Sequence, residues 1–408
     1  MVVVIGGGAS GLLVSILISR GGESITLLEK SSRVGKKILA SGNGKCNIGN
    51  INPTADRYHS SNIGFIDEVL DGYKAQDIID IFRTIGVEII EMADGKLFPL
   101  SLQASSVVDI LEYEAKRLGV NIISDYEVKN ISIEKNSKFI IDDNIIADTL
   151  ILATGSPASP KLGGSNSGLD LAKSFGHNII SPLPSLVQLT SDELWVKDVT
   201  GVKIKSRVKL YSNGEYIRER DGDILFTNYG VSGLAILDIS RNVSIELSNY
   251  SYCELSIDLM PNYTKEQLIK LFLSHIKLDR EIKIFLNGFI NKKVIDIVLK
   301  QSKSKVKNSN SLNRKEIAKI VYSIKNLKLS ISGTRGFNSA EVAIGGVDTK
   351  EIVAQTMQSK LVKNLYLTGE ILDIDGDRGG FNFHFAWVSA MRVAKAIIEI
   401  IPQVSERA

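Results

Sequence analysis

The chain has 408 residues, of which 44% are hydrophobic and 23% are charged, and its net charge is +3. This composition is typical of an ordinary globular protein with two or three domains, and the small net charge gives no global field favouring nucleic acid or acidic membranes. The only cysteines, Cys46 and Cys253, exclude a C-x-x-C redox pair and a four-cysteine zinc site.

The first thirty residues predict a dinucleotide-binding unit. Val2–Ile5 is an apolar strand that runs into residues 6–11, GGGASG, which have G-x-G-x-x-G spacing. A helix is expected from residue 12 to about 19, and a second strand, Ile25–Leu28, ends in Glu29. Such a turn places helix N–H groups at a pyrophosphate, and the acid about 20 residues later holds ribose hydroxyls. A structural glycine turn is the alternative, but the whole strand–turn–helix–strand–acid order favours the dinucleotide.

The next segment, residues 31–53, is rich in glycine, asparagine and lysine. We interpret it as a ligand-wrapping loop, neither helix nor central strand, in which Lys36, Lys37 and Lys45 place positive charge near phosphates. A solvated surface loop is the alternative.

The middle of the chain predicts further alternation. Residues 62–90 have helical spacing, Asp94-Gly95 marks a turn, Pro99 ends a strand, and a helix is expected from Ser105 to Gly119. Strands are expected at residues 120–124, 126–133 and 139–141. A last strand, TLIL, ends at Ala153-Thr154-Gly155 and returns to the cofactor edge.

From about residue 188 the pattern changes to short strands, with an Asn213-Gly214 hairpin, which predicts an antiparallel barrel or sandwich. Three helical stretches follow within 261–327: TKEQLIKLFLSHI, REIKIFLNGFINKKVIDIVLKQ and RKEIAKIVYSIKN. Strands resume at LKLSISG and AEVAIGGVD. A strand, NLYLTGE, and a long helix over residues 379–401 close the chain.

The chain resembles a bacterial family of NAD(P)/FAD-dependent, aminoacetone-oxidase-like flavoproteins. The similarity rests on GGGASG, GKKILASGNGKCN, DGKLFP, ILFTNYGVSGLAIL, AEVAIGGV and LYLTGEILDIDGDRGGFNF. It implies an α/β fold whose Rossmann-like FAD-binding domain, of the glutathione-reductase type, holds an inserted antiparallel β domain with a helical insertion. The implied bounds are 1–187 and 348–408 for the FAD domain, 188–260 and 328–347 for the β domain, and 261–327 for the helices.

The resemblance also implies FAD contacts. The pyrophosphate and adenosine ribose are expected at Gly6, Gly8, Ala9, Ser10, Gly11 and Glu29. The extended cofactor is expected along Lys30, Lys36, Ser41, Gly42, Asn43, Gly44 and Asn47, with the adenine side at Val128, Ala153, Thr154 and Gly155. The ribityl chain and flavin are expected at Gly369, Glu370, Gly380, Phe381 and Asn382, where the last helix points its N–H groups at the flavin N1 and O2.

Several positions depart from the family pattern. Ser156 follows Ala-Thr-Gly where glycine is usual, Asn228 replaces a histidine, Leu234 replaces a proline, and Phe383-His384 stands where glutamine is common. These changes bear on the substrate and on catalytic roles, and they leave the fold expectation intact.

Three groups of side chains are candidates for catalysis or metal binding. His384 is a candidate proton donor or a packed helix histidine, and Cys46 is a flavin neighbour or a buried filler. Asp373, Asp375 and Asp377 lack EF-hand spacing, so a turn that caps the last helix is preferred and no metal is expected.

Residues 292–335 carry twelve Lys or Arg against Asp296 and Glu316. This surface is interpreted first as a solvated face, then as a site for an anionic substrate or pyridine nucleotide, and last as an RNA contact. Nucleic acid is not expected, on the reasoning that aromatic residues do not interleave the basic ones.

The sequence therefore predicts a cytoplasmic, membrane-free FAD-dependent oxidoreductase that transfers hydride between flavin N5 and a small organic substrate. No second strand–glycine–helix unit follows Gly155, so NADH or NADPH, if it is the donor, is expected to visit the flavin transiently; otherwise the substrate itself or oxygen is the electron partner. The alternatives are an FAD-dependent RNA-modifying enzyme that uses the basic helices, a non-catalytic flavin-binding protein, and a plain NAD-dependent dehydrogenase. Covalent attachment of the flavin, the catalytic acid and the oligomeric state stay open.

Overall fold

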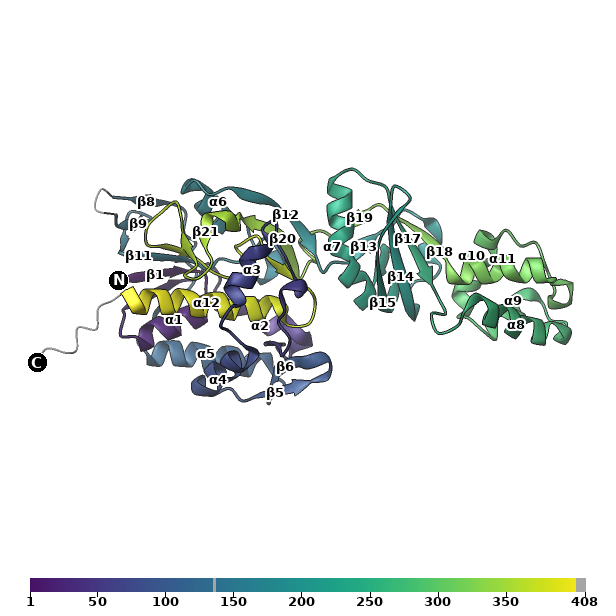
Figure 1. The fold of residues 1–408 in the computed structure, drawn as a ribbon, viewed down its shortest axis with the longest axis horizontal. Helices are drawn as coiled ribbons and strands as arrows, with labels where there is room; N and C mark the ends of the chain where they lie inside the picture. Colours follow the sequence, from purple (N-terminus) through teal and green to yellow (C-terminus); the bar gives the residue numbers. More distant parts are fainter. Residues whose placement is uncertain (135–136, 401–408) are drawn as a thin grey trace, which may run out of the picture. The chain divides into compact units, whose positions relative to one another are not determined.

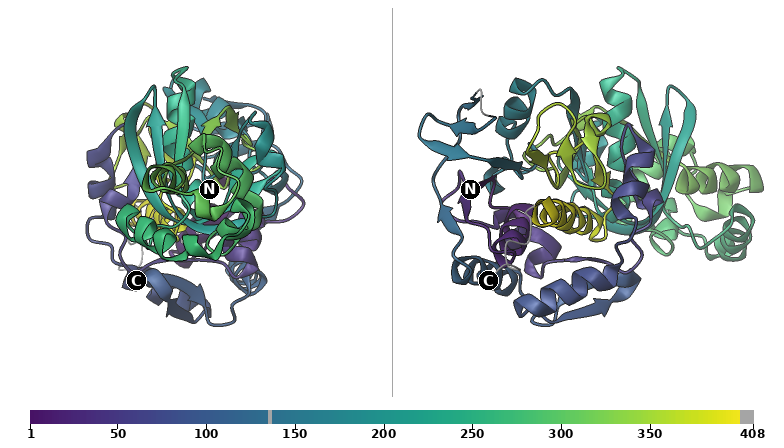
Figure 2. Two further views of the ribbon diagram at one scale, coloured as in Figure 1. Left: turned by 90° about the vertical axis from the view of Figure 1, so that its right-hand side faces the viewer. Right: turned by 60° about the vertical axis from the view of Figure 1, so that its left-hand side comes forward.

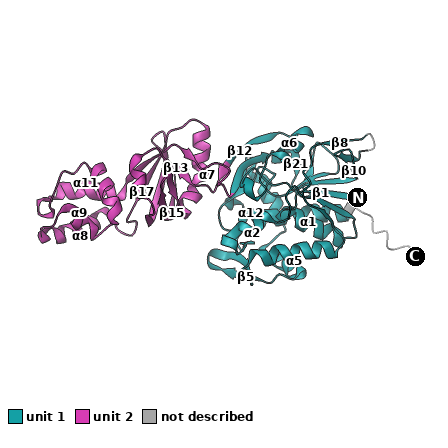
Figure 3. Cartoon of the chain, turned by 180° about the vertical axis from the view of Figure 1, so that it is seen from behind, with its two compact units in different colours: residues 1–183, 342–408 teal, residues 184–341 magenta. Residues whose placement is uncertain are grey.

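A computed structural model describes residues 1–134 and 137–400. The chain forms two compact units (Figure 3): unit 1 is residues 1–183 together with the chain from 342 onward, and unit 2 is residues 184–341. Residue 401, the last of the predicted final helix, lies outside the described residues. Within these, no helix combines the length and the apolar character that crossing a membrane requires.

The core of unit 1 is a seven-stranded sheet in the order β21-β22-β23-β11-β1-β2-β7 (Figure 1). The predicted first strand, β1, lies between β11 and β2. The strands β7, β2, β1, β11 and β23 run parallel to one another, whereas β22 pairs antiparallel with both β23 and β21. Every residue of β1 is buried, as expected for a strand covered on both faces. The strands are β1 Val2–Ile5, β2 Ile25–Leu28, β7 Asn121–Ile123, β11 Thr149–Leu152, β21 Ile352–Val353, β22 Gln358–Ser359 and β23 Leu365–Leu367.

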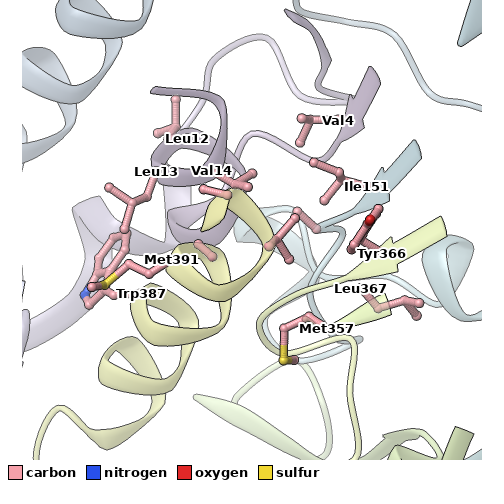
Figure 4. Packing of buried hydrophobic residues seen from close by; sticks show 14 of the residues in the cluster. Val4, Leu12, Leu13, Val14, Ile151, Met357, Tyr366, Leu367, Trp387 and Met391 are labelled. Atoms are coloured by element: carbon pink, nitrogen blue, oxygen red, sulfur yellow. The ribbon is translucent and has the colours of Figure 1, made fainter. Parts of the chain in front are cut away.

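The first and last helices of the chain lie side by side in unit 1 (Figure 2). Leu13 of α1 points toward Trp387 and Met391 of α12, and these residues extend the core that the sheet begins (Figure 4). The helices of this unit are α1 Ala9–Arg20, α2 Lys36–Ala40, α3 Ile63–Leu70, α4 Ala75–Ile85, α5 Ala104–Arg117, α6 Ser167–Ser174 and α12 Phe381–Ile400. Segments more than 360 residues apart therefore share one hydrophobic core.

Two helix predictions in unit 1 need correction. Residues 31–53, predicted as a loop, contain the short helix α2 and a 3-10 turn, Ser41–Gly44. The helix forms because Ile38 is buried and anchors the polar residues around it. The single helix expected over 62–90 is two helices, α3 and α4, separated by a turn in which Gly72 has φ +76°. Glycine adopts this left-handed conformation readily, which ends α3.

Small sheets complete unit 1. They are formed by β8 Ile131–Ile133, β9 Phe139–Ile141 and β10 Ile145–Ala147; by β3 Gly49–Asn50, β5 Ile89–Met92 and β6 Lys96–Pro99; by β4 Tyr58–His59 and β24 Asp375–Gly376; and by β12 Ile179–Ser185 and β20 Val342–Val347. The strand expected over 126–133 is limited to β8, because Lys129 and Asn130 donate their N–H groups to the Asp142 side chain.

Unit 2 contains one open sheet in the order β18-β17-β14-β15-β16-β13-β19, with antiparallel pairs throughout. The Asn213-Gly214 hairpin is confirmed between β14 and β15. The prediction of a barrel or sandwich is wrong, because the strands form a single layer. This layer packs against the helix α7 Leu234–Ser248, whose Ile236, Ile239 and Val243 are buried. The strands are β13 Leu189–Thr190, β14 Lys203–Ser212, β15 Glu215–Thr227, β16 Gly230–Ser232, β17 Cys253–Asp258, β18 Leu327–Ile331 and β19 Gly333–Thr334.

The helical insertion between β17 and β18 is confirmed, and its helices gather at one end of unit 2 (Figure 1). The second predicted stretch splits into two helices, because the chain turns at residues 288–294. The helices are α8 Lys265–His275, α9 Ile282–Asn287, α10 Ile295–Ser302 and α11 Arg314–Lys325.

A buried arginine joins α12 to the end of α3. The Arg392 side chain is only 8% exposed. Its guanidinium donates hydrogen bonds to four carbonyl oxygens, those of Glu68, Val69 and Asp71 at 2.7 Å and that of Gln355 at 3.2 Å. The last carbonyls of a helix have no partner within the helix, so this guanidinium satisfies groups that burial would otherwise leave unpaired.

We therefore expect Arg392→Met to lower the free energy of unfolding by about 3 kcal/mol, because several carbonyls lose a charged donor. Lys395→Met, on the exposed side of the same helix, should change it by less than about 0.5 kcal/mol. Urea unfolding of the two variants measures the difference, and equal stability would contradict the role assigned to Arg392.

Candidate functional site

The glycine turn after β1 is as tight as the sequence predicts. Gly6 has φ +105°, and a methyl group there would lie 2.4 Å from the carbonyl oxygen of Ala153. A methyl group on Gly11 would lie 1.8 Å from the carbonyl oxygen of Gly6. Both glycines are thus needed to bring α1 against the carboxyl ends of β1 and β11.

Gly8 differs from these two, because no atom lies within 4 Å of the place that its missing side chain would take. It is the N-cap of α1, with an extended backbone, no side-chain cap and no acid in the first turn of the helix. The first N–H groups of a helix lack partners within it and carry the positive end of its dipole. Open space in front of such a helix end is the arrangement that accepts a phosphate group.

Glu29 stands at the end of β2 and is held by the backbone. One carboxylate oxygen accepts the N–H of Gly7 at 2.7 Å, and the other accepts the N–H of Ser31 at 2.7 Å. These bonds fix the carboxylate beside the glycine turn, at the position where this type of fold holds ribose hydroxyls.

A pocket of about 410 Å³ lies next to Glu29 and is lined by residues that include Lys30, Ser31, Lys36, Asp125, Glu127 and Lys161. Burial lowers the pKa of Lys30, and the charges of Glu127 and Glu29 oppose this effect. Lys30 and Lys36 are predicted from the sequence, whereas Asp125, Glu127 and Lys161 are not. The signal for the two acids was available, since β7 runs parallel to β2 and the loop after it must reach the same edge. Val128, predicted at the adenine, follows Glu127 and is buried.

Three predicted segments meet at an ion pair. Lys37 Nζ lies 2.7 Å from Glu370 Oε2 and 3.5 Å from Ser156 Oγ, which joins α2 to the loops after β11 and β23. The sequence placed Lys37 only as general positive charge. Gly369, one residue before the glutamate, has φ +75°, which favours glycine, and a methyl group there would lie 2.6 Å from Ser10 Oγ.

The remaining residues predicted to bind FAD differ in whether they lie near the Lys37–Glu370 ion pair. Gly155 adjoins the Glu370 carboxylate, whereas the Thr154 hydroxyl is turned into the packing against Gly168 of α6. Ala153 and Ala9 lie at the turn itself. Gly42, Asn43 and Gly44 have left-handed backbones in an exposed turn, and Ser41 donates to the carbonyl of Ile38.

The start of α12 is brought against the same loop. A methyl group on Gly380 would lie 2.4 Å from the carbonyl oxygen of Gly49 and 2.7 Å from Asn47 Oδ1. Asn47 Oδ1 is buried and has no hydrogen-bond partner among the described residues. The Phe381 side chain is buried under Arg57, and the Asn382 side chain bonds both backbone groups of Gly376. The side chains of these two residues therefore serve the fold, which leaves their backbone as the part predicted to meet the flavin.

The two candidate catalytic side chains, His384 and Cys46, are buried in the protein. His384 is 0% exposed, neither ring nitrogen has a partner among the described residues, and burial lowers its pKa to about 4. Cys46 is also 0% exposed, and burial raises the pKa of its thiol to about 12. These observations favour packing over proton transfer or nucleophilic chemistry.

The aspartates of the loop before α12 serve the fold. Asp377 lies 3.2 Å from His59 and 3.6 Å from Arg57, and Asp373 accepts the N–H of Ser61 at 2.9 Å. In the part of the chain that the structure describes, no three His, Cys, Asp or Glu side chains cluster as metal ligands would.

The residues present fit FAD. The open space at Gly8 suits the pyrophosphate, Glu29 and its neighbouring pocket suit the adenosine, and the unpartnered Asn47 Oδ1 lies at the helix start predicted to meet the flavin.

Residues 1–396 match the family model of the HI0933-like protein Rossmann domain. The chain belongs to this family. It is 33% identical to a 3-dehydro-bile acid delta(4,6)-reductase of Clostridium scindens over 97% of this chain and 98% of that one. It is 30% identical to a ribosomal RNA dihydrouridine synthase of Haemophilus influenzae, again over 97% and 98% of the two chains.

Solved structures show the same fold. A 3-ketosteroid Δ1-dehydrogenase of Sterolibacterium denitrificans matches with a TM-score of 0.52 at 10% identity, covering 98% of this chain and 99% of that one. The α/β fold with an antiparallel insert, the FAD cofactor and the oxidoreductase class are thereby confirmed for this member of the family. The finer likeness to aminoacetone oxidases stays a prediction.

Gly8→Ala tests the pyrophosphate position. The protein itself has room for this methyl group, so the variant should fold with unchanged stability and yet lose FAD, because the methyl group takes the space of the phosphates. We expect FAD affinity to fall at least about tenfold, which corresponds to about 1.4 kcal/mol. Flavin absorbance and apoprotein melting temperature measure the two effects.

Gly64→Ala is the matched control, since Gly64 in α3 also has no atom within 4 Å of the added methyl group. It should leave both FAD content and melting temperature unchanged or slightly raise the latter. Full FAD content in the Gly8 variant would contradict the placement of the pyrophosphate.

His384 predicts a pH dependence of stability. Its pKa is depressed from 6.5 to about 4 in the fold, so the unfolded chain binds the extra proton first and stability falls as pH drops from about 6.5 toward 4. Between pH 7 and 5 this histidine should account for a loss of about 2 kcal/mol. Urea unfolding of the wild type and of His384→Gln at both pH values measures this loss. An equal loss of stability in the two proteins would show that His384 is not its cause.

Proposed function

We propose that this protein transfers a hydride between FAD and a carbon–carbon double bond conjugated with a carbonyl group in a small organic substrate. The observation that carries the proposal is what two relatives share, although their substrates differ. The bile-acid enzyme is named for reduction at the 4,6 positions beside a 3-oxo group, and a dihydrouridine synthase saturates the uracil bond next to a carbonyl. Both names describe reduction of a polarised alkene.

The residues named above supply binding and electrostatics. Gly8 and the N-terminus of α1 receive the pyrophosphate, and Glu29 holds the ribose. Lys37 and Glu370 tie the loops after β11 and β23 to α2, which keeps the cofactor-facing backbone in one arrangement. FAD, when bound, supplies hydride chemistry at its N5, and the positive start of α12 favours the reduced, anionic form.

Reduction of the alkene also requires a proton at the second carbon. We infer that His384 does not provide it, because its ring is enclosed by protein and has no hydrogen-bond partner among the described residues. The proton donor therefore belongs to another side chain or to water. Among the described residues only the β1–α1–β2 unit carries the G-x-G-x-x-G spacing, so a nicotinamide that serves as reductant would visit the flavin transiently and would have no dinucleotide unit of its own.

The test is an anaerobic titration of the purified holoprotein. We expect NADH or NADPH to bleach the flavin bands, and 4-androstene-3,17-dione to restore them with one equivalent of the 4,5-saturated ketone as product. The saturated ketone itself is the matched control and should leave the reduced flavin unchanged.

Other results separate the alternatives. Reoxidation by uridine-containing RNA and not by the steroid would replace the small-molecule substrate with RNA. Flavin that is bleached but reoxidised only by oxygen would overturn the proposal, and flavin that no reductant bleaches would favour a non-catalytic flavin-binding protein.

A further inference from the structure

A side chain that protonates the substrate has to be within reach of it, and the four histidines of the chain differ in this respect. The His384 ring is enclosed by protein. The His177 side chain is also fully buried, and its two ring nitrogens are engaged by Glu351 at 2.8 Å and by Ser359 at 2.9 Å. Neither of these rings can therefore reach a bound molecule.

The other two histidines are partly exposed. His275 ends α8, and its Nδ1 lies 2.9 Å from the carbonyl oxygen of Leu271, one helical turn back. His59 is the second residue of β4, and its side chain is 23% exposed. The His59 ring is also paired with a carboxylate, because its Nε2 lies 3.2 Å from Asp377 Oδ1. A histidine that a carboxylate orients and that stays accessible is the usual arrangement of a general acid or base.

The His59–Asp377 pair adjoins the start of α12. The strands β4 and β24 are paired, so that Asp375 lies directly opposite His59. Asp377 donates its N–H to the carbonyl oxygen of Arg57 at 2.8 Å. The Arg57 guanidinium in turn lies 4.7 Å from the ring centre of Phe381, the first residue of α12. The pair is thus fixed beside the helix start that is predicted to meet the flavin.

Asp377 sets the orientation of the imidazole ring. Its Oδ1 holds His59 Nε2 and its Oδ2 lies 3.6 Å from Arg57, so both carboxylate oxygens are engaged. The second ring nitrogen of His59, Nδ1, has no hydrogen-bond partner among the described residues. A carboxylate at one ring nitrogen stabilises the imidazolium form, which carries a proton on the other nitrogen as well. The other charged groups beside the ring are those of Arg57 and, across the strand pair, Asp375.

We propose that His59 is the proton donor to the substrate and that Asp377 positions it. This inference rests on the proposed function, which supplies the hydride. Hydride addition to the β-carbon of the conjugated ketone breaks the π bond of the alkene and leaves an enolate. The imidazolium of His59 then gives its Nδ1 proton to the α-carbon, where the enolate electrons form the new C–H bond and the carbonyl group is restored. The neutral imidazole regains a proton from water.

Stopped-flow absorbance of the FAD-loaded full chain isolates this step. The flavin is reduced anaerobically with one equivalent of dithionite and is then mixed with an oxidant. In His59→Gln, reoxidation by 4-androstene-3,17-dione should be at least about a hundredfold slower than in the wild type, as expected for the loss of a general acid. Reoxidation by ferricyanide should keep the wild-type rate, because ferricyanide takes up electrons without protonation of a carbon atom.

The pH dependence of the same reaction tests the role of Asp377. In the wild type, reoxidation by the steroid should slow as pH rises, because the imidazolium loses its proton. In Asp377→Asn this decline should begin at lower pH, since the neutral amide no longer stabilises the imidazolium. In His59→Gln the decline should be absent. A purely structural role of the pair would change the rate by the same factor at every pH.

His275→Gln is the matched control, because it removes the other partly exposed histidine, and it should reoxidise like the wild type. Three results would overturn the assignment: a wild-type rate with the steroid in His59→Gln, equal slowing with the steroid and with ferricyanide, or equal losses in His59→Gln and His275→Gln. A wild type that does not reduce the steroid at all would refute the proposed function together with this step. The two failures are therefore distinguishable.

Discussion

The close approach of Gly11 to the carbonyl oxygen of Gly6 is the constraint on which the rest of unit 1 depends. A single methyl group at Gly11 would lie 1.8 Å from that oxygen, so only glycine lets α1 start directly above the end of β1. Because α1 sits there, its buried Leu13 packs toward Trp387 of α12. The position of α12, the last described helix, thus depends on a turn within the first eleven residues of the chain.

This arrangement explains why binding groups from distant segments reach one edge. In a parallel sheet the carboxyl ends of the strands meet, and here β1, β2, β11 and β23 end in the glycine turn, Glu29, residues 153–155 and residues 369–370. The Lys37–Glu370 ion pair then connects two of these loops to α2. The protein's contribution to flavin chemistry is therefore mostly a fixed backbone with a few charges.

Unit 2 follows a different logic. Its sheet is antiparallel and is covered by α7, and its charged helices form a second hydrophobic core with the sheet. The helical insertion buries most of its apolar residues, with Leu278 and Ile284 exposed, and keeps nearly all its lysines at the surface. Such a division is expected of any amphipathic group of helices.

The sequence by itself determined the dinucleotide unit, the hairpin at Asn213-Gly214, the nested helices and the final helix, because each is specified by local spacing: glycines at fixed offsets, a two-residue turn, or apolar residues at helical period. It also pointed to the family through motifs spread along the whole chain. Tertiary structure alone decided that α7 is a helix against an open sheet, since its amphipathic pattern is weak and packing overrides it. It likewise decided that His384 is enclosed and that Asp125, Glu127 and Lys161 share a pocket. Burial and long-range proximity depend on how distant segments pack, and no local spacing encodes them.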